Sequence, residues 1–171
     1  MSIKRFIVLF CAALALSACA SAKVAQSVRG NYVGPPIRTV AIAPGGGALA
    51  DSVGVELFNR GINVVDSEQT QGILGHVGIS EIQIATPQSY AALRSAGADA
   101  LLIVKGVMGA DGTPESASAR LTSTATGEVV AGITWQNGWG GMRGSIADRT
   151  MRKNLAEAAS EVSDSLMQRM Q

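Results

Sequence analysis

Four consecutive large apolar residues, Leu101 to Val104, constrain the fold of this chain more than any other feature. Gly97 precedes the run and Gly106 follows it, so the segment is only about one strand long. A short run that is apolar on both faces is typical of a strand covered on both sides, as in a mostly parallel sheet flanked by helices. We therefore predict that residues 98–106 form the central strand.

The chain before this strand alternates predicted strands and helices. The expected elements are a strand at 39–43, a helix at 48–60, a strand at 62–65, a short helix at 66–74 and a helix at 86–96. Right-handed crossovers then make the first three strands parallel. In the helix at 48–60, Phe58 widens an apolar stripe made by Leu49, Val53 and Leu57, so this face is expected to be buried.

The pattern changes after Gly106. Residues 116–125 and 128–137 predict an antiparallel hairpin that turns at Thr126-Gly127. Ser145 with Asp148 is expected to cap one long last helix that continues to Met170. The predicted fold class is α/β, a three-layer-like mixed sheet in one domain over 38–171, with parallel strands and crossover helices followed by an antiparallel hairpin and a long C-terminal helix.

The N-terminal residues predict export. Lys4 and Arg5 precede an apolar stretch at 6–16, which is shorter than the roughly 20 residues needed to cross a bilayer. Leu16-Ser17-Ala18-Cys19 resembles a bacterial lipobox, which implies a signal peptide at 1–18 and a lipid, palmitate included, on Cys19. An ordinary secretory signal cut near Ala18 or Ala20 is the alternative. Residues 19–37 show no periodicity and are expected to form a flexible tether, which would let the domain stand off the membrane.

Composition excludes several functions. Cys11 lies in the predicted signal, so the mature chain has no cysteine besides Cys19 and no disulfide framework or cysteine metal site. Loss of Lys4 and Arg5 lowers the basic residues from 14 to 12, against 13 acidic ones. A charge so near zero, without a basic run, argues against nucleic-acid binding.

Few residues have the pattern of a chemical site. Gly45, Gly46 and Gly47 precede a predicted helix, where backbone N–H groups can hold an anion, although a plain strand-to-helix turn is the preferred interpretation. His76 is the only histidine, which predicts neither a hydrolytic triad nor a zinc site. Asp99, Asp111 and Glu115 could form an acid pair, but a solvated rim is the preferred interpretation. We predict no catalytic residue, no metal and no cofactor.

The two tryptophans are candidates for partner contact. Trp139 lies among glycines at 138–141, a loop that offers a large ring little support, and is predicted to be a partner anchor or a membrane-interface contact. Trp135 alternates with Ile133 on the last predicted strand, so it is either a partner contact or part of the core.

Several of these motifs occur together in one known superfamily. A first strand ending in Pro44, the Gly97-Ala98-Asp99 entry to the central strand, and the Ala119-Arg120-Leu121 and Thr126-Gly127-Glu128 hairpin motifs follow one another in the family's order. Over residues 38–138 the chain resembles the periplasmic domain shared by curli-secretion (CsgG-type) lipoproteins and penicillin-binding-protein activator lipoproteins, itself similar to the TolB N-terminal domain. The connections here are short and leave no room for the membrane-spanning hairpins of the curli-type pores.

The resemblance and the lipobox together imply a function class. We expect a small outer-membrane lipoprotein on the periplasmic face, acting as a non-enzymatic adaptor in envelope assembly, secretion or cell-wall synthesis. Its partners would be the membrane, through its lipid, and an unidentified envelope protein. A subunit of an oligomeric ring or export channel is the first alternative, and a ligand or nucleotide-binding domain that uses residues 45–47 is the second.

The lipid attachment can be tested directly. Cys19→Ser removes the only thiol that the lipobox offers, so palmitate labelling should be lost and the domain should appear in the soluble periplasmic fraction. A Cys11→Ser variant is the matched control and should keep its label. A Cys19→Ser variant that stays membrane-bound, beside an unlabelled wild type, would contradict the lipoprotein prediction.

Overall fold

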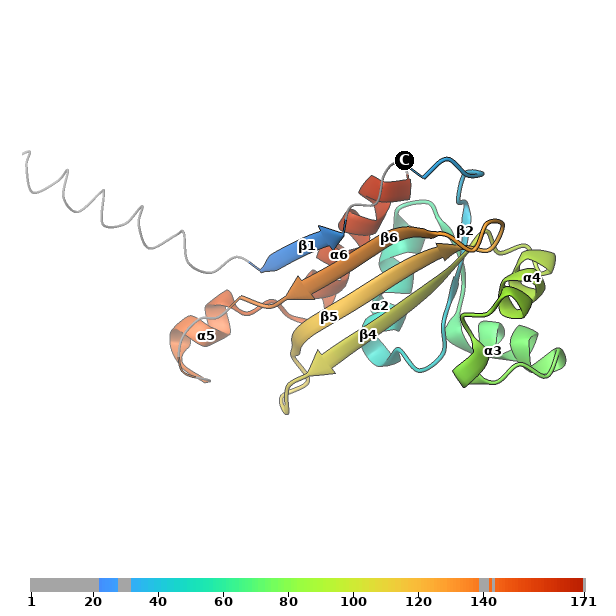
Figure 1. The fold of residues 1–171 in the computed structure, drawn as a ribbon. Helices are drawn as coiled ribbons and strands as arrows, with labels where there is room; N and C mark the ends of the chain where they lie inside the picture. The colour runs from blue at the N-terminus through green and yellow to red at the C-terminus, as the bar shows by residue number, and fades with distance from the viewer. Residues whose placement is uncertain (1–21, 28–31, 139–141, 143, 171) are drawn as a thin grey trace, which may run out of the picture.

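A computed structural model describes residues 22–27, 32–138, 142 and 144–170 of the chain (Figure 1). Within them, six strands form one mixed sheet in the order β1-β6-β5-β4-β2-β3. The strands are β1 (Lys23–Ser27), β2 (Thr39–Ile42), β3 (Asn63–Val65), β4 (Ala100–Met108), β5 (Pro114–Ser123) and β6 (Val129–Gln136). The α-helices are α2 (Gly47–Asn59), α3 (Ser67–His76), α4 (Pro87–Ser95), α5 (Ile146–Met151) and α6 (Leu155–Met170), and a 3₁₀ turn, η1, spans Glu81–Gln83.

The central strand is confirmed. β4 lies inside the sheet, parallel to β2 and antiparallel to β5. Successive side chains of a strand point to opposite faces, so Leu101 and Leu102 reach two different cores, and both are 0% exposed. The parallel pairing of β2 with β3 and β4, and the antiparallel hairpin of β5 and β6, are confirmed as well.

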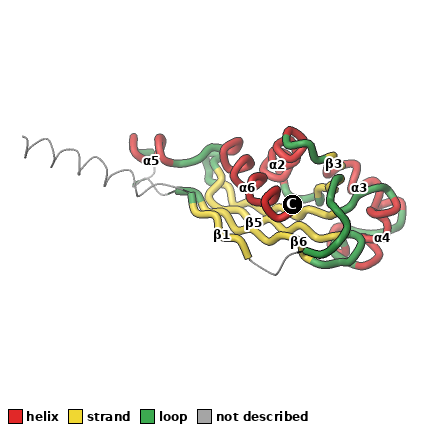
Figure 2. The backbone as a smooth tube through the Cα atoms, turned by 90° about the horizontal axis from the view of Figure 1, so that it is seen from above, coloured by secondary structure: helices red, strands yellow, loops and turns green. Residues whose placement is uncertain are grey.

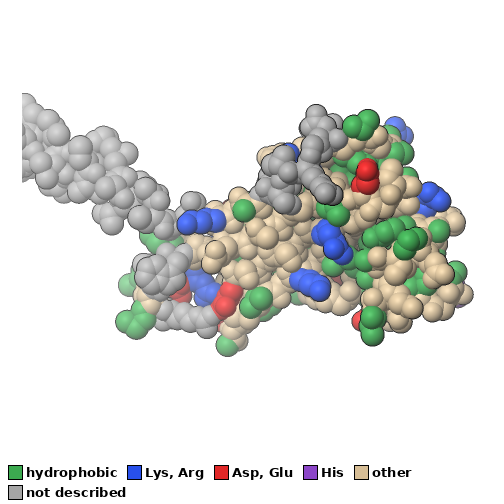
Figure 3. All heavy atoms as spheres, in the orientation of Figure 1, with side chains coloured by type: hydrophobic (Ala, Val, Ile, Leu, Met, Phe, Trp, Pro, Cys, Tyr) green, Lys and Arg blue, Asp and Glu red, His purple; other side chains and the backbone are tan. Residues whose placement is uncertain are grey.

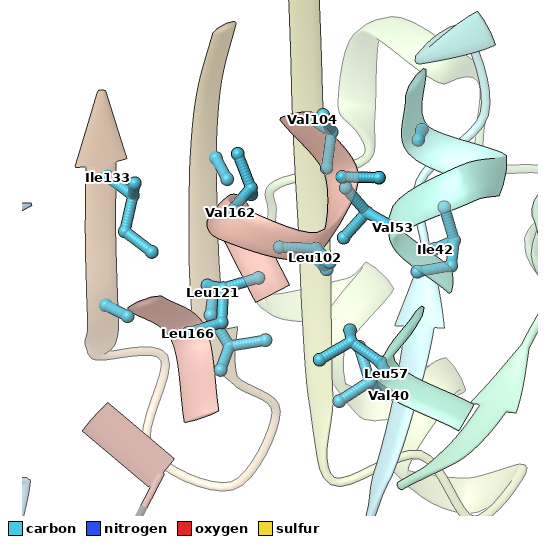
Figure 4. Close-up of a cluster of buried hydrophobic side chains, with 14 of the residues drawn as sticks. Val40, Ile42, Val53, Leu57, Leu102, Val104, Leu121, Ile133, Val162 and Leu166 are labelled. Carbon is cyan, nitrogen blue, oxygen red and sulfur yellow. The ribbon is translucent and has the colours of Figure 1, made fainter. Parts of the chain in front are cut away.

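The larger core lies between the sheet and two helices. α2 and α6 lie side by side over the same face of the sheet (Figure 2), and the Ser163 hydroxyl of α6 donates to the Val53 carbonyl of α2 at 3.4 Å. Aliphatic side chains from both helices interdigitate with those of the strands (Figure 4). They include Val40, Ile42, Val53, Leu57, Leu102, Val104, Leu121, Ile133, Val162 and Leu166.

The other face of the sheet is covered only at one end. α3 and α4 pack there on β2 and the first half of β4, and they enclose a smaller core made by Ala41, Ala43, Leu74, Leu93, Ala98 and Leu101. No described helix lies over the rest of this face, on β1, β6, β5 and the second half of β4 (Figure 1). The three-layer arrangement is therefore confined to one end of the sheet.

Helix ends follow their sequence signals. The Asp66 carboxylate accepts from the Gln69 N–H at 2.7 Å, and the Thr86 hydroxyl accepts from the Ser89 N–H at 3.3 Å, which confirms both predicted caps. Gly61 follows α2 with φ +88°, a conformation that favours glycine. Among the described residues, no helix is long and apolar enough to cross a bilayer.

The expected tether is wrong for part of its length. Lys23–Ser27 form β1, which pairs antiparallel with β6 at the edge of the sheet. Nearer the first parallel strand, Ile37 is buried, and the Tyr32 hydroxyl donates to Ser123 Oγ at 3.0 Å. The domain therefore begins at about Lys23 rather than at residue 38, because this polar segment gains backbone pairing that its irregular side-chain pattern does not signal.

The long C-terminal helix is confirmed, but it begins at Leu155 and not directly after Ser145 as predicted. Ser145 does cap a helix, accepting from the Asp148 N–H at 3.1 Å, but α5 ends at Met151 and the backbone is extended at Arg152. α6 then starts with a capping box of its own, in which Asn154 and Glu157 exchange side-chain to backbone hydrogen bonds of 2.9 and 3.0 Å. The break follows from that second cap.

Phe58 does not join the buried face of α2. It is 65% exposed, beside Val55 at 60%, while Leu49, Val53 and Leu57 are buried. The sheet ends nearby at β3, which has only three residues, so no further strand is present to cover this side of the helix.

The central strand should tolerate no charge. Leu102→Asp places an unpaired carboxylate in the larger core, at a cost of several kcal/mol against a total stability of about 5–15 kcal/mol. We expect loss of cooperative thermal unfolding by circular dichroism. Ile82→Asp, at a position 97% exposed, is the control and should change stability by no more than about 0.5 kcal/mol. A Leu102→Asp variant that melts at the same temperature as wild type would contradict the sheet order.

Candidate binding surface

The uncovered part of the sheet presents a mostly polar surface, which we call the open face. Strand register sets its rows: Lys105 lies opposite Ser118, Ser118 opposite Thr134, and Thr134 opposite Ala25. The open face comprises Lys23, Ala25, Lys105, Val107, Ser116, Ser118, Arg120, Thr134 and Gln136. Most of these side chains are small, so the cations project from a flat surface, with Lys105 and Arg120 toward its middle and Lys23 at its edge strand.

Three shallow hollows meet at Lys105, which lines all of them. One of about 520 Å³ extends across the strands toward Lys23. A second, of about 620 Å³, lies between the sheet and the segment around η1, where Arg120 and Glu81 line it. The third, of about 440 Å³, reaches the loop at 45–47. Lys105 is therefore the centre of the hollowed surface.

Within the part of the chain that the structure describes, Lys105 and Arg120 of the open face have no carboxylate partner. Register places Arg120 opposite Ile103, so Lys105 and Arg120 are diagonal neighbours on adjacent strands, a relation that separates side chains by about 7–8 Å. Neither forms an ion pair with a carboxylate of the described residues, whereas Arg60 and Arg152 each do. Lys and Arg side chains stand out here from a largely uncharged surface (Figure 3). An anionic partner would supply the missing counter-charge.

The loop at 45–47 lies beside this surface, and packing and backbone conformation explain why its residues are glycines. A Cβ on Gly46 would lie 2.9 Å from the Val104 carbonyl oxygen and 2.4 Å from the Ala50 Cβ, so only glycine lets α2 start this close to β4. Gly45 and Gly47 have φ of +81° and +61°, which other residues rarely adopt. Gly46 caps α2 without a side-chain hydrogen bond, and no acid lies in the first turn. The three anion-binding candidates thus share a hollow with Lys105.

Trp135 is a core residue, which corrects its candidacy as a partner contact. Its side chain is 1% exposed, and Nε1 donates to Glu161 Oε2 of α6 at 2.7 Å. Alternation with Ala131 and Ile133, both buried, puts the ring on the face covered by α6. Trp139 and the predicted lipidation site Cys19 lie outside the described residues.

The remaining titratable candidates are separated. Asp99, at the start of β4, accepts from the backbone N–H groups of Arg38 and Thr39 at 2.8 and 2.9 Å. Asp111 and Glu115 lie beyond the other end of this nine-residue strand, roughly 30 Å away, and contact Arg152 at 3.4 and 3.9 Å. No acid pair forms between the two ends.

Asp111 and His76 lie in different local environments. The Thr113 backbone N–H lowers the pKa of the Asp111 carboxyl below its ordinary value, and Arg152 adds to the shift. His76 is exposed at the end of α3. Within the described ranges, no three metal-ligating side chains cluster.

Sequence reasoning missed Lys105 and Arg120. Lys105 directly follows the apolar run, so it must point away from the core that receives Val104. Arg120 lies between the core residues Ala119 and Leu121, which places it on the opposite face by the same alternation. Strand register then brings them together, and the apolar pattern did not predict that register.

Comparison with known proteins gives weak structural similarity only. No family model matches the sequence, and no curated protein matches it significantly. A PelC dodecamer from Paraburkholderia phytofirmans is similar over 84% of this chain and 99% of that one, at 18% identity and a TM-score of 0.48.

Two further solved structures are similar at the same level. Lipoprotein GNA1162 from Neisseria meningitidis matches over 75% of this chain and 99% of that one, at 17% identity and a TM-score of 0.47. The LpoB C-terminal domain from Salmonella enterica matches over 63% and 87%, at 16% identity and a TM-score of 0.46. Similarity of this degree does not establish a shared function, and the resemblance to curli-secretion proteins stays a prediction.

The Trp135 contact predicts a graded loss of stability. Trp135→Ala should cost about 3–5 kcal/mol, as large aromatic truncations do, because it leaves a cavity under α6. Trp135→Phe keeps most of the ring volume but loses the hydrogen bond to Glu161, whose carboxylate is one-third exposed and lies 3.7 Å from Lys153, so the cost should be about 1 kcal/mol. Glu161→Gln retains an acceptor and should cost less than either. Urea unfolding checks this order, and a Trp135→Ala variant as stable as wild type would contradict the core assignment.

Proposed function

We propose that this chain is a lipid-anchored, non-enzymatic adaptor of the bacterial outer membrane, which binds an acidic surface of an envelope protein through its open face. The lipid anchor rests on the Leu16–Cys19 motif. The outer-membrane location rests on the residue after Cys19, which is Ala20 and not an aspartate; by resemblance to bacterial lipoprotein sorting, this implies export to the outer membrane. The periplasmic side and a role in envelope assembly, secretion or cell-wall synthesis come from the family resemblance.

The single observation that carries the contact surface is the pair of unmatched cations, Lys105 and Arg120. A carboxylate placed against these two cations would gain charge complementarity and charge-assisted hydrogen bonds. Ser118, beside Lys105 in the same row, adds a hydroxyl group that can donate to the same partner, whereas the Thr134 hydroxyl donates to the Ala25 carbonyl at 3.3 Å. Small side chains let another protein approach the sheet closely.

The acidic side chains considered as candidates for acid–base chemistry each make hydrogen bonds or ion pairs within the fold. Asp99 holds the start of β2, Asp111 and Glu115 contact Arg152, and Glu161 accepts from Trp135. These engagements support an adaptor over an enzyme. A ligand or nucleotide-binding role for residues 45–47 would instead predict a ligand-dependent rise in melting temperature, about 2.7 kcal/mol of stabilisation at a hundred times the Kd.

Charge removal tests the open face. Lys105→Gln with Arg120→Gln should leave the melting temperature unchanged, since both side chains are exposed, and should weaken partner binding about tenfold or more, because each charged contact contributes roughly 1–2 kcal/mol. The measurement is crosslinking in the native envelope, followed by affinity for the recovered partner. The difference from wild type should shrink at high salt, where charges are screened.

Arg38→Gln with Arg94→Gln is the matched control, since it removes two exposed cations outside the open face. This variant should recover the partner as wild type does. If the Lys105–Arg120 variant crosslinks to the same proteins with unchanged affinity, the open face is not the contact surface. If both double variants lose binding equally, net charge rather than position is responsible, and the proposal fails.

A further inference from the structure

The position of β1 limits how far the domain can lie from a lipid on Cys19. β1 begins at Lys23, only four residues after Cys19. At about 3.3–3.6 Å per extended residue, that link spans at most about 14 Å, far less than the long tether that the sequence suggested. This step rests on the proposed lipid anchor. The end of the sheet at which β1 begins must then lie close to the membrane surface.

The same end collects exposed apolar side chains. The start of β1 pairs with the end of β6, which pairs with the start of β5, which pairs with the end of β4, and α5 lies nearby (Figure 1). Of the eleven large hydrophobic side chains exposed in the described part of the chain, five lie here. They are Val24, Val107, Met108, Met142 and Ile146, with Met142 82% and Ile146 85% exposed. We call this set the apolar end.

Hydrogen bonds hold the chain that follows α5 against the sheet. The Asn137 side chain donates to the carbonyls of Pro114 and Lys153 at 2.6 and 2.9 Å, and its oxygen accepts from the Lys153 N–H at 2.9 Å. Arg152 also contacts Asp111 in the turn between β4 and β5. The return of the chain after α5 is therefore fixed beside the start of β5.

The carboxylates at this end are partly neutralised by Arg152, so apolar side chains rather than charge would carry a contact with phospholipid. Asp111, Glu115 and Asp148 are the carboxylates nearest α5 and the adjoining turn, and each lies within 4 Å of the Arg152 guanidinium. Lys23 adds a cation at the start of β1. Phospholipid headgroups carry the phosphates that attract such a cation.

We propose that the apolar end docks on the phospholipid surface, with Val107, Met142 and Ile146 entering the boundary between headgroups and acyl chains. Interfacial binding of this kind scales with the apolar area that leaves water. A lipid on Cys19 holds the apolar end at the membrane, so each side chain needs to contribute little. The strands then run away from the bilayer, and the open face is presented sideways to a neighbouring protein.

The test measures contact between single positions and lipid. Met142→Cys and Ile146→Cys, labelled with an environment-sensitive fluorophore in the full lipidated chain, should be quenched by brominated lipids in phosphatidylethanolamine–phosphatidylglycerol vesicles. Val129→Cys, 47% exposed at the start of β6 and so at the opposite end of the sheet, is the matched label and should not be quenched. Adding Val107→Ser and Ile146→Ser to the Met142 label should reduce its quenching, whereas Val55→Ser with Phe58→Ser on α2 should not.

Flotation of the vesicles separates the two proposals. If the chain floats with the vesicles and no label is quenched, or all three are quenched equally, docking through the apolar end is overturned and the lipid anchor stands. If the chain does not float, the anchor is overturned, and this inference falls with it. Loss of partner crosslinking without any change in quenching concerns the open face and leaves the apolar end supported.

Discussion

Burial of β4 on both faces is the constraint on which the rest of this structure depends. Because Leu101 and Leu102 project in opposite directions, the chain must provide apolar cover on two sides of one strand. α2 and α6 supply one side, and α3 with α4 supply the other. The covering helices on the second side come from the crossover between β3 and β4, so their reach is set by that connection and ends partway along the strand.

The open face is the part of the sheet that α3 and α4 do not cover. A nine-residue central strand is longer than the crossover helices can cover, and the hairpin of β5 and β6 extends the sheet beyond them. Uncovered sheet is stable in water only with polar side chains on its outer face, and Ser, Thr and Gln meet that need without charge. Lys105 and Arg120 add positive charge to this outer face, and the proposed contact rests on that charge.

The parts of the fold that sequence predicted are those with strong local signals. The apolar run identified β4, and Asp66 and Thr86 identified two helix starts, because a cap is decided by a few adjacent residues. Most of the features that the sequence did not predict depend on residues far apart in the chain. β1 is recruited by backbone pairing with β6, and Lys105 meets Arg120 only through the register of two strands. Asn154 with Glu157 did carry a local signal for the break between α5 and α6, but the continuous apolar spacing across it favoured one helix.

The edge position of β1 has a mechanical consequence. Any pull on a lipid attached before Lys23 would reach the domain along β1, whose hydrogen bonds to β6 stand nearly perpendicular to the strand. Force along the strand loads those bonds together, in shear, rather than opening them one after another. The five paired residues of β1 would thus transmit tension from the membrane to the rest of the sheet. Under sufficient load, the pairing of β1 with β6 would be the first contact to break.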